Sequence, residues 1–136
     1  MAEIKRMLFV DDDAKRMASL VEMLEMEQWE VTHFTSPTDA VEELEQRSAD
    51  FYSCAVLDMA MPHEAFGEAE TDGGRRTGLA VLERLRKHAP ELPVIVFSVM
   101  RDPDVQARAK ELGIQRWISK PALPSELIEA IREVTK

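Results

Sequence analysis

The stretch FVDDDAKRM, residues 9–17, sets three aspartates directly after an apolar run that begins at Met7. A short apolar run of this kind is typical of a buried β-strand. Neighbouring carboxylates repel one another, so a chain that places three of them at the end of a buried strand needs something to offset the repulsion. From Ala14 onward, apolar residues recur at intervals of three and four, which predicts a helix directly after the aspartates.

The same alternation of apolar runs and amphipathic helical patterns repeats along the chain. We expect strands at residues 7–10, 29–34, 51–57, 93–97 and 115–119, and helices that begin near Ala14, Pro37, Gly78, Pro103 and Pro124. Strands that are apolar on both faces and separated by helices indicate a parallel sheet covered on both sides. Right-handed crossovers then predict a doubly wound α/β fold, a flavodoxin-like three-layer sandwich with strand order 2-1-3-4-5.

Composition suits one domain over residues 1–136, with 45% apolar residues and a formal charge of -9. An acidic domain lacks the basic face that phosphate contacts need, so we expect no direct binding to nucleic acid. No apolar run approaches the roughly 18 residues of a membrane span, which predicts no membrane partner and a cytoplasmic protein. The single cysteine, Cys54, lies in an apolar run and is interpreted as a buried thiol.

Charged or polar side chains follow four of the five predicted strands. Asp11 and Asp12 follow the first strand, Asp58 the third, Ser98 the fourth and Lys120 the fifth. The carboxyl ends of parallel strands open onto one edge of the sheet, where ligands bind at the switch point of the strand order. These five side chains are therefore expected to converge.

Three converging carboxylates favour a hard divalent cation, and Mg²⁺ takes oxygen ligands. Asp12 and Asp58 are expected to bind the ion directly and Asp11 through a water, with the carbonyl of Ala60 as a further ligand. Asp58 would then keep one oxygen free to attack phosphorus.

Phosphoryl transfer depends on positioning and charge neutralisation, which Lys120 and Ser98 would supply to the phosphoryl oxygens. Each residue also has a plainer interpretation when taken alone. Asp13 suits a helix N-cap, Ser98 a loop hydroxyl and Lys120 a surface lysine. Their joint occurrence at four strand ends favours a single site.

Five short motifs occur in a fixed order along the chain. They are Val10-Asp11-Asp12, Leu57-Asp58-Met59-Ala60-Met61-Pro62, Gly78-Leu79 with Leu82 and Leu85-Arg86, Val96-Phe97-Ser98, and Lys120-Pro121. As a set they resemble the receiver domain of response regulators in two-component signalling, over about residues 5–135. The resemblance implies that Asp58 accepts a phosphoryl group from a phosphohistidine on a partner histidine kinase or phosphotransfer protein. It also implies that Asp11 and Asp12 hold Mg²⁺.

The resemblance further implies a switch. Ser98 would move toward the phosphoryl group, and the ring of Trp117 would rotate inward into the vacated space. A half-buried tryptophan that simply packs at the sheet edge is the alternative. The family also implies a cis peptide at Lys120-Pro121.

One departure from the family is the insertion HEAFGEAETDGGRRT, residues 63–77, between Pro62 and Gly78. It is polar and contains glycine, which is typical of a mobile surface loop. In either interpretation we expect the insertion to overhang the site. The alternative to a mobile loop is a lid or partner-recognition element, with Arg75 and Arg76 as phosphate or carboxylate contacts.

A second departure concerns the residues two positions past Asp58 and Ser98. Both Ala60 and Met100 are apolar and cannot orient an attacking water through a hydrogen bond, so we expect slow self-dephosphorylation. Of the three histidines, only His63 is expected near the site, and all three are interpreted as surface or packing residues.

The leading hypothesis is a stand-alone, phosphorylation-dependent switch, either a monomer or a homodimer on phosphorylation. Its downstream protein target would bind the face made by the fourth helix, the fifth strand and the fifth helix. A piece of a larger regulator is one alternative. A Mg²⁺-dependent phosphohydrolase is another alternative. An enzyme of that kind with an aspartyl intermediate would usually have an acidic residue two positions past its nucleophile, where this chain has Ala60. A third alternative is a receiver-like binding module that is never phosphorylated. The three carboxylates argue against it, because such a module has no need to hold repelling charges together.

Overall fold

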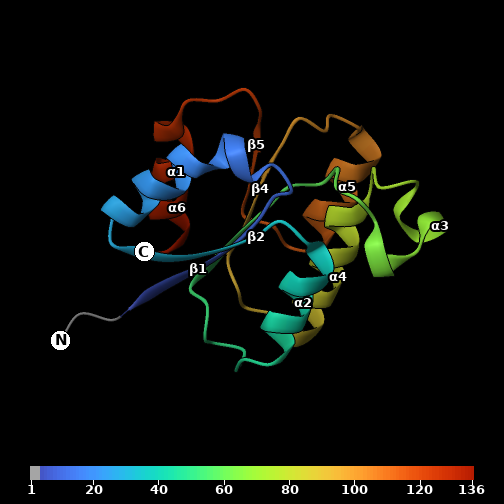
Figure 1. The fold of residues 1–136 in the computed structure, drawn as a ribbon, viewed down its shortest axis with the longest axis horizontal. Helices are drawn as coiled ribbons and strands as arrows, with labels where there is room; N and C mark the ends of the chain where they lie inside the picture. Colours follow the sequence, from blue (N-terminus) through green and yellow to red (C-terminus); the bar gives the residue numbers. More distant parts are fainter. Residues whose placement is uncertain (1–3) are drawn as a thin grey trace.

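Five parallel strands form one sheet in the order β2-β1-β3-β4-β5 (Figure 1). The strands are β1 (Lys5–Val10), β2 (Trp29–Phe34), β3 (Cys54–Leu57), β4 (Val94–Ser98) and β5 (Arg116–Ser119). This order confirms the predicted doubly wound α/β fold. The computed structural model describes residues 4–136, so the first three residues of the domain predicted over 1–136 lie outside the described residues.

Helices cover both faces of the sheet. They are α1 (Ala14–Met26), α2 (Pro37–Glu45), the 3₁₀ helix η1 (Glu64–Phe66), α3 (Glu68–Thr71), α4 (Thr77–His88), α5 (Pro103–Glu111) and α6 (Pro124–Val134). Helices α1 and α6 lie on one face, and α2, α4 and α5 lie on the other (Figure 1). The alternation of side chains along β1 accounts for both layers, because Met7 and Phe9 pack toward α1 and α6 while Leu8 and Val10 pack toward α2 and α4.

Three helices begin where the sequence predicts because a capping side chain precedes each of them. Asp13, Ser36 and Asp102 each accept a hydrogen bond from a backbone amide two or three residues later. Such a bond satisfies one of the amides that a helix leaves unpaired at its start. The N-cap interpretation of Asp13 is therefore confirmed.

Strand β3 is shorter than predicted, since Cys54–Leu57 replaces the expected 51–57. The side chain of Phe51 lies between the guanidinium groups of Arg6 and Arg47, each 4.5 Å from the ring centroid. Aromatic residues favour strands in general, but here the amide of Phe51 donates to the carbonyl of Ser48 in a turn, so its backbone lies outside the ladder while its ring stacks with two arginines. The cysteine at the start of β3 is fully buried, and burial raises the pKa of its thiol to about 12.

Arg86, at the end of α4, joins that helix to the turn after α5. Its guanidinium donates to the carbonyl oxygens of Leu112 at 2.6 Å, Leu92 at 2.7 Å and Gly113 at 2.9 Å. Partial burial lowers the pKa of Arg86. One side chain thus satisfies carbonyls from two separate turns, which fixes α4 and α5 relative to each other.

The substitution Arg86→Met is expected to lower the free energy of unfolding by about 2–3 kcal/mol, because charged donors are lost from carbonyls that are partly shielded from water. Urea denaturation measures the change. The matched control is Lys87→Met on the exposed side of α4, which should stay within about 0.5 kcal/mol of the wild type. Equal losses in the two variants would contradict the assigned role of Arg86.

Candidate functional site

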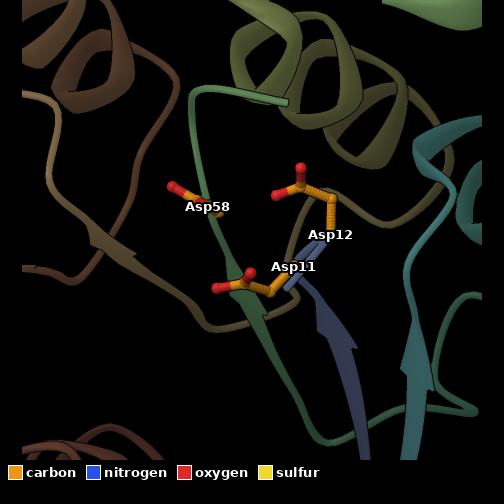
Figure 2. Close-up of side chains that lie close together, drawn as sticks. All are labelled: Asp11, Asp12 and Asp58. Carbon is orange, nitrogen blue, oxygen red and sulfur yellow. The ribbon is translucent and has the colours of Figure 1, made fainter. Parts of the chain in front are cut away.

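The carboxyl ends of β1 and β3 bring three aspartates together (Figure 2). Asp11 and Asp12 follow β1, Asp58 follows β3, and one carboxylate oxygen of each lies within 4.8 Å of the others. The register explains this proximity. Val10 is aligned with Leu57, and the amide of Asp58 donates to the carbonyl of Val10 at 2.9 Å, so the next residues on the two strands emerge side by side.

The two carboxylate oxygens of Asp58 have different surroundings. Oδ1 accepts hydrogen bonds from Ser98 Oγ at 2.5 Å and from the amide of Met59 at 2.7 Å. Oδ2 has no hydrogen bond among the described residues and lies 3.6 Å from Lys120 Nζ. One oxygen therefore orients the group, and the other faces the lysine.

Both carboxylate oxygens of Asp11 accept a hydrogen bond. Its Oδ2 accepts from Lys120 Nζ at 2.7 Å, and its Oδ1 accepts from the amide of Asp13 at 2.9 Å. The lysine ammonium also lies 5.1 Å from the ring centroid of Phe97, and the peptide between Lys120 and Pro121 is cis, as the resemblance implies. The structure thus brings the five predicted strand-end residues into one site.

Burial and mutual repulsion raise the pKa of two of the carboxyl groups. For Asp58, burial is the main cause; Ser98 and Lys120 act against it, and the charge of Asp11 adds to it. Asp12 is exposed on its outer side, and its pKa is raised first by the partial loss of solvent on the side of the pocket and second by the charge of Asp11. The ionised state is therefore held at a cost in free energy, and an all-oxygen donor set of this kind fits a hard cation such as Mg²⁺.

The pocket around the aspartates has a volume of about 330 Å³. It is lined by Asp11, Asp12, Asp13, Arg16, Met17, Asp58, Val99 and Lys120. Asp12 faces solvent while Asp11 and Asp58 are buried, so the pocket opens on the side of Asp12. Val99 is a large apolar residue with 61% of its surface exposed at this rim.

Residues 63–77 do not line this pocket, although the sequence led us to expect that they overhang the site. They form η1 and α3 and run along α2 and α4 instead (Figure 1). The buried ring of Phe66 is the physical reason, because it joins the apolar core on that face of the sheet. Both arginines of the insertion therefore lie away from the carboxylates; Arg75 contacts carboxylates elsewhere, on Asp72 and Asp102.

His33 is a neighbour of the site that the sequence analysis missed. Its Nε2 lies 2.9 Å from the carbonyl oxygen of Asp11, and its ring contacts Phe9 edge to face. The expectation that only His63 lies near the site is wrong. The missed signal is the strand order, which places the end of β2 beside the end of β1.

Gly78 allows the backbone after Asp58 to take its position. Its amide donates to the carbonyl of Met59 at 2.8 Å, and a Cβ at this position would lie 2.2 Å from the carbonyl oxygen of Asp58. Any side chain there would push the loop that carries the aspartate. The start of α4 is thus packed directly on the site.

The two residues of the predicted switch, Ser98 and Trp117, have different surroundings in this structure. Ser98 Oγ already contacts Asp58, so the inward movement expected for this serine is not needed for the contact. Trp117 is half-buried, and its Nε1 is a buried donor with no partner among residues 4–136. Ala60 lies half-buried two residues past Asp58, and its carbonyl as a metal ligand stays a prediction.

Replacing Asp58 by asparagine is expected to stabilise the metal-free protein, with Tm at neutral pH rising by roughly 2–6 °C. The raised pKa of Asp58 means that the folded state binds a proton more tightly than the unfolded state. Stability therefore falls as pH rises from the unfolded value near 4 through the folded value. The advantage of the asparagine variant should accordingly shrink when thermal unfolding scans at pH 7 are compared with scans near pH 4, close to the unfolded value.

A matched control is Asp50→Asn, because Asp50 is exposed and, within residues 4–136, its side chain forms a hydrogen bond only with the hydroxyl of Ser48. Its Tm should equal that of the wild type at both pH values. A lower Tm for Asp58→Asn than for the wild type at pH 7 without metal would show that the ionised carboxylate stabilises the site.

Comparison with known proteins agrees with this geometry. Residues 7–132 match the response regulator receiver domain, and the chain belongs to that family. The transcriptional regulatory protein CssR of Bacillus subtilis is 31% identical over 92% of this chain, which spans 48% of CssR, about half its length. The chemotaxis protein CheY of Thermotoga maritima is 27% identical over 97% of this chain and 98% of its own. The crystal structure of a CheY-like receiver domain protein from Methanospirillum hungatei JF-1 superposes with a TM-score of 0.81 at 25% identity, covering 96% of this chain and 93% of the other.

Proposed function

We propose that this domain is a phosphorylation-dependent signalling switch in which Asp58 accepts the phosphoryl group. The supporting observation is that the two carboxylate oxygens of Asp58 have different partners. Oδ1 accepts hydrogen bonds from Ser98 and Met59, while Oδ2 faces Lys120 and accepts no hydrogen bond from any of residues 4–136. A nucleophile needs one oriented, unblocked oxygen, and an opposing cation that neutralises charge on the incoming group.

The proposed donor is a phosphohistidine on a histidine kinase or phosphotransfer protein. Asp58 Oδ2 forms the new P–O bond as the P–N bond breaks, and the imidazole leaves with the electron pair. Lys120 neutralises charge on the phosphoryl oxygens. Ser98 exchanges its hydrogen bond to Asp58 Oδ1 for one to a phosphoryl oxygen, because its hydroxyl has a single hydrogen to donate.

Asp11, Asp12 and Asp58 would hold Mg²⁺, with the carbonyl of Ala60 as a further ligand. When bound, the ion supplies positive charge that lowers the repulsion between the carboxylates and an anionic phosphoryl group. The supporting observation is an all-oxygen donor set with raised pKa at Asp12 and Asp58.

The proposed output surface lies on α5, β5 and α6, away from the phosphoryl acceptor. Trp117 lines a groove of about 440 Å³ there, together with Gln106 and Lys110 of α5 and Arg116 and Ser119 of β5. In the described part of the chain, the buried indole N–H of Trp117 has no hydrogen-bond partner, so this position of the ring carries a cost in free energy. Rotation outward would let water satisfy the N–H, which brings the two positions of the ring closer in free energy. A downstream protein would read that change.

The location and assembly of the protein stay predictions. Among residues 4–136, no helix combines the length and the apolar character that crossing a bilayer requires. A cytoplasmic location, the absence of direct nucleic-acid binding, and a monomer or a phosphorylation-dependent homodimer rest on the sequence argument alone.

Incubation with acetyl phosphate and Mg²⁺ is expected to add one phosphoryl group, measured as an intact-mass increase. Asp58→Asn should abolish the gain, and Asp50→Asn should retain it, because the latter residue lies away from the pocket. Chelating the metal should reduce uptake sharply. Donor turnover without accumulation would instead indicate a phosphohydrolase, and no reaction at all a binding module that is not phosphorylated.

Self-dephosphorylation is expected to be slow, because Ala60 and Met100 offer no hydrogen bond to an attacking water. After removal of the donor, the mass increase should decay much more slowly than in Ala60→Glu, in which a carboxylate could orient water and speed hydrolysis roughly tenfold. Ala65→Glu, at an exposed position of the insertion, is the matched control. A wild-type half-life of seconds would contradict the prediction.

A further inference from the structure

The insertion, residues 63–77, is a packed strap rather than a free loop. Phe66 is buried in the core, and Thr77 Oγ1 donates to the carbonyl of Met61 at 2.6 Å. Gly74 has a φ of +99°, and a Cβ there would lie 2.7 Å from the same Met61 carbonyl oxygen. The end of the strap is therefore closed tightly against the segment that follows Asp58.

The first anchor of the strap is the start of α2. Glu64 Oε1 accepts from Ser36 Oγ at 2.8 Å and from the amide of Thr38 at 3.0 Å. Slight burial acts to raise the pKa of Glu64, but these hydrogen bonds outweigh it and lower the pKa. A carboxylate at this position also suits the positive end of a helix.

The second anchor is the start of α5. Arg75 donates to Asp72, which is part of the strap, at 2.8 Å. It also donates to Oδ2 of Asp102, which lies outside the strap, at 3.1 Å. The other oxygen of Asp102 accepts from the amide of Asp104 at 2.9 Å, which makes Asp102 the N-cap of α5. The strap thus links the first turns of α2 and α5 past α4 (Figure 1).

The second anchor lies four residues from the proposed site. Ser98 Oγ, which contacts Asp58, also accepts from the amide of Met100 at 3.2 Å. Arg101 donates to the carbonyl of Lys120 at 3.1 Å. The loop 99–102 is therefore tied at one end to the serine and lysine of the site, and at the other end to the strap.

We propose that the Arg75–Asp102 ion pair is a latch, through which the strap holds loop 99–102 in the arrangement that lets Ser98 reach Asp58. The expected effect of this latch on the rate of phosphorylation rests on the proposed function of Asp58. The ion pair is partly exposed, so its effect is modest, about two- to fivefold in an equilibrium or a rate. Because coupling between two sites is reciprocal, phosphorylation should in turn alter the dynamics of the strap.

The first test uses the unphosphorylated protein. Arg75→Gln is expected to speed hydrogen exchange about two- to fivefold in peptides covering residues 63–77 and 99–106, because both ends of the latch are released. Arg76→Gln makes the same charge change one residue along, where the guanidinium forms no ion pair among the described residues. Exchange in 99–106 that is the same in the two variants would overturn the latch.

The second test measures the initial rate of phosphoryl uptake from acetyl phosphate. Arg75→Gln and Asp102→Asn should each slow uptake about two- to fivefold, and the double variant no more than either, because all three lack the same ion pair. Asparagine caps a helix as well as aspartate does, so Asp102→Asn keeps the start of α5 intact. In 1 M salt, which screens exposed charges, the variants should match the wild type.

Additive losses in the double variant, or uptake equal to that of Arg76→Gln, would show that the latch does not act on the site. A wild-type protein that takes up no phosphoryl group would end the proposed function of Asp58. The exchange measurement would then still decide, by itself, whether the strap holds the loop.

Discussion

The ion pair between Lys120 and Asp11 is the contact on which the site depends. Neighbouring strands lie about 4.8 Å apart, and β4 and β3 separate the end of β5 from the end of β1. The lysine therefore has to reach across two strand ends, and in doing so it passes over Phe97 and close to Asp58. One ammonium thereby serves two of the three carboxyl groups, and the repulsion that remains leaves a place for a divalent cation.

The sheet order and the convergence of the strand-end residues were predictable, because both follow from periodicity and from the geometry of parallel crossovers. The exceptions have local causes that periodicity does not contain. Phe51 has the residue type of a strand, but its amide donates within a turn and its ring stacks with two arginines. His33 approaches Asp11 through a contact with a backbone carbonyl, which no side-chain motif encodes.

The packing of the insertion was not predictable from its composition. Its polar, glycine-containing composition is that of a surface loop, and most of its side chains are exposed. Its placement is set by a few tertiary contacts, namely the burial of Phe66 and the reach of Glu64 to α2. Composition describes the average of a segment, whereas these contacts depend on single side chains and on partners far away in the chain.

A parallel α/β sheet also explains why a segment inserted after β3 becomes linked to the site. Each strand ends at the edge where the next helix begins, so helix N-termini surround the carboxyl ends of the strands. A chain that leaves β3 at this edge therefore lies close to the unpaired amides and the N-cap carboxylates of neighbouring helices. Glu64 contacts the amide of Thr38 at the start of α2, and Arg75 contacts the carboxylate of Asp102 at the start of α5. The cap of α5 is only four residues from Ser98, and loop 99–102, which joins them, contacts both Ser98 and Lys120. An insertion at this point is therefore in a position to affect Asp58 without entering the pocket of the three aspartates.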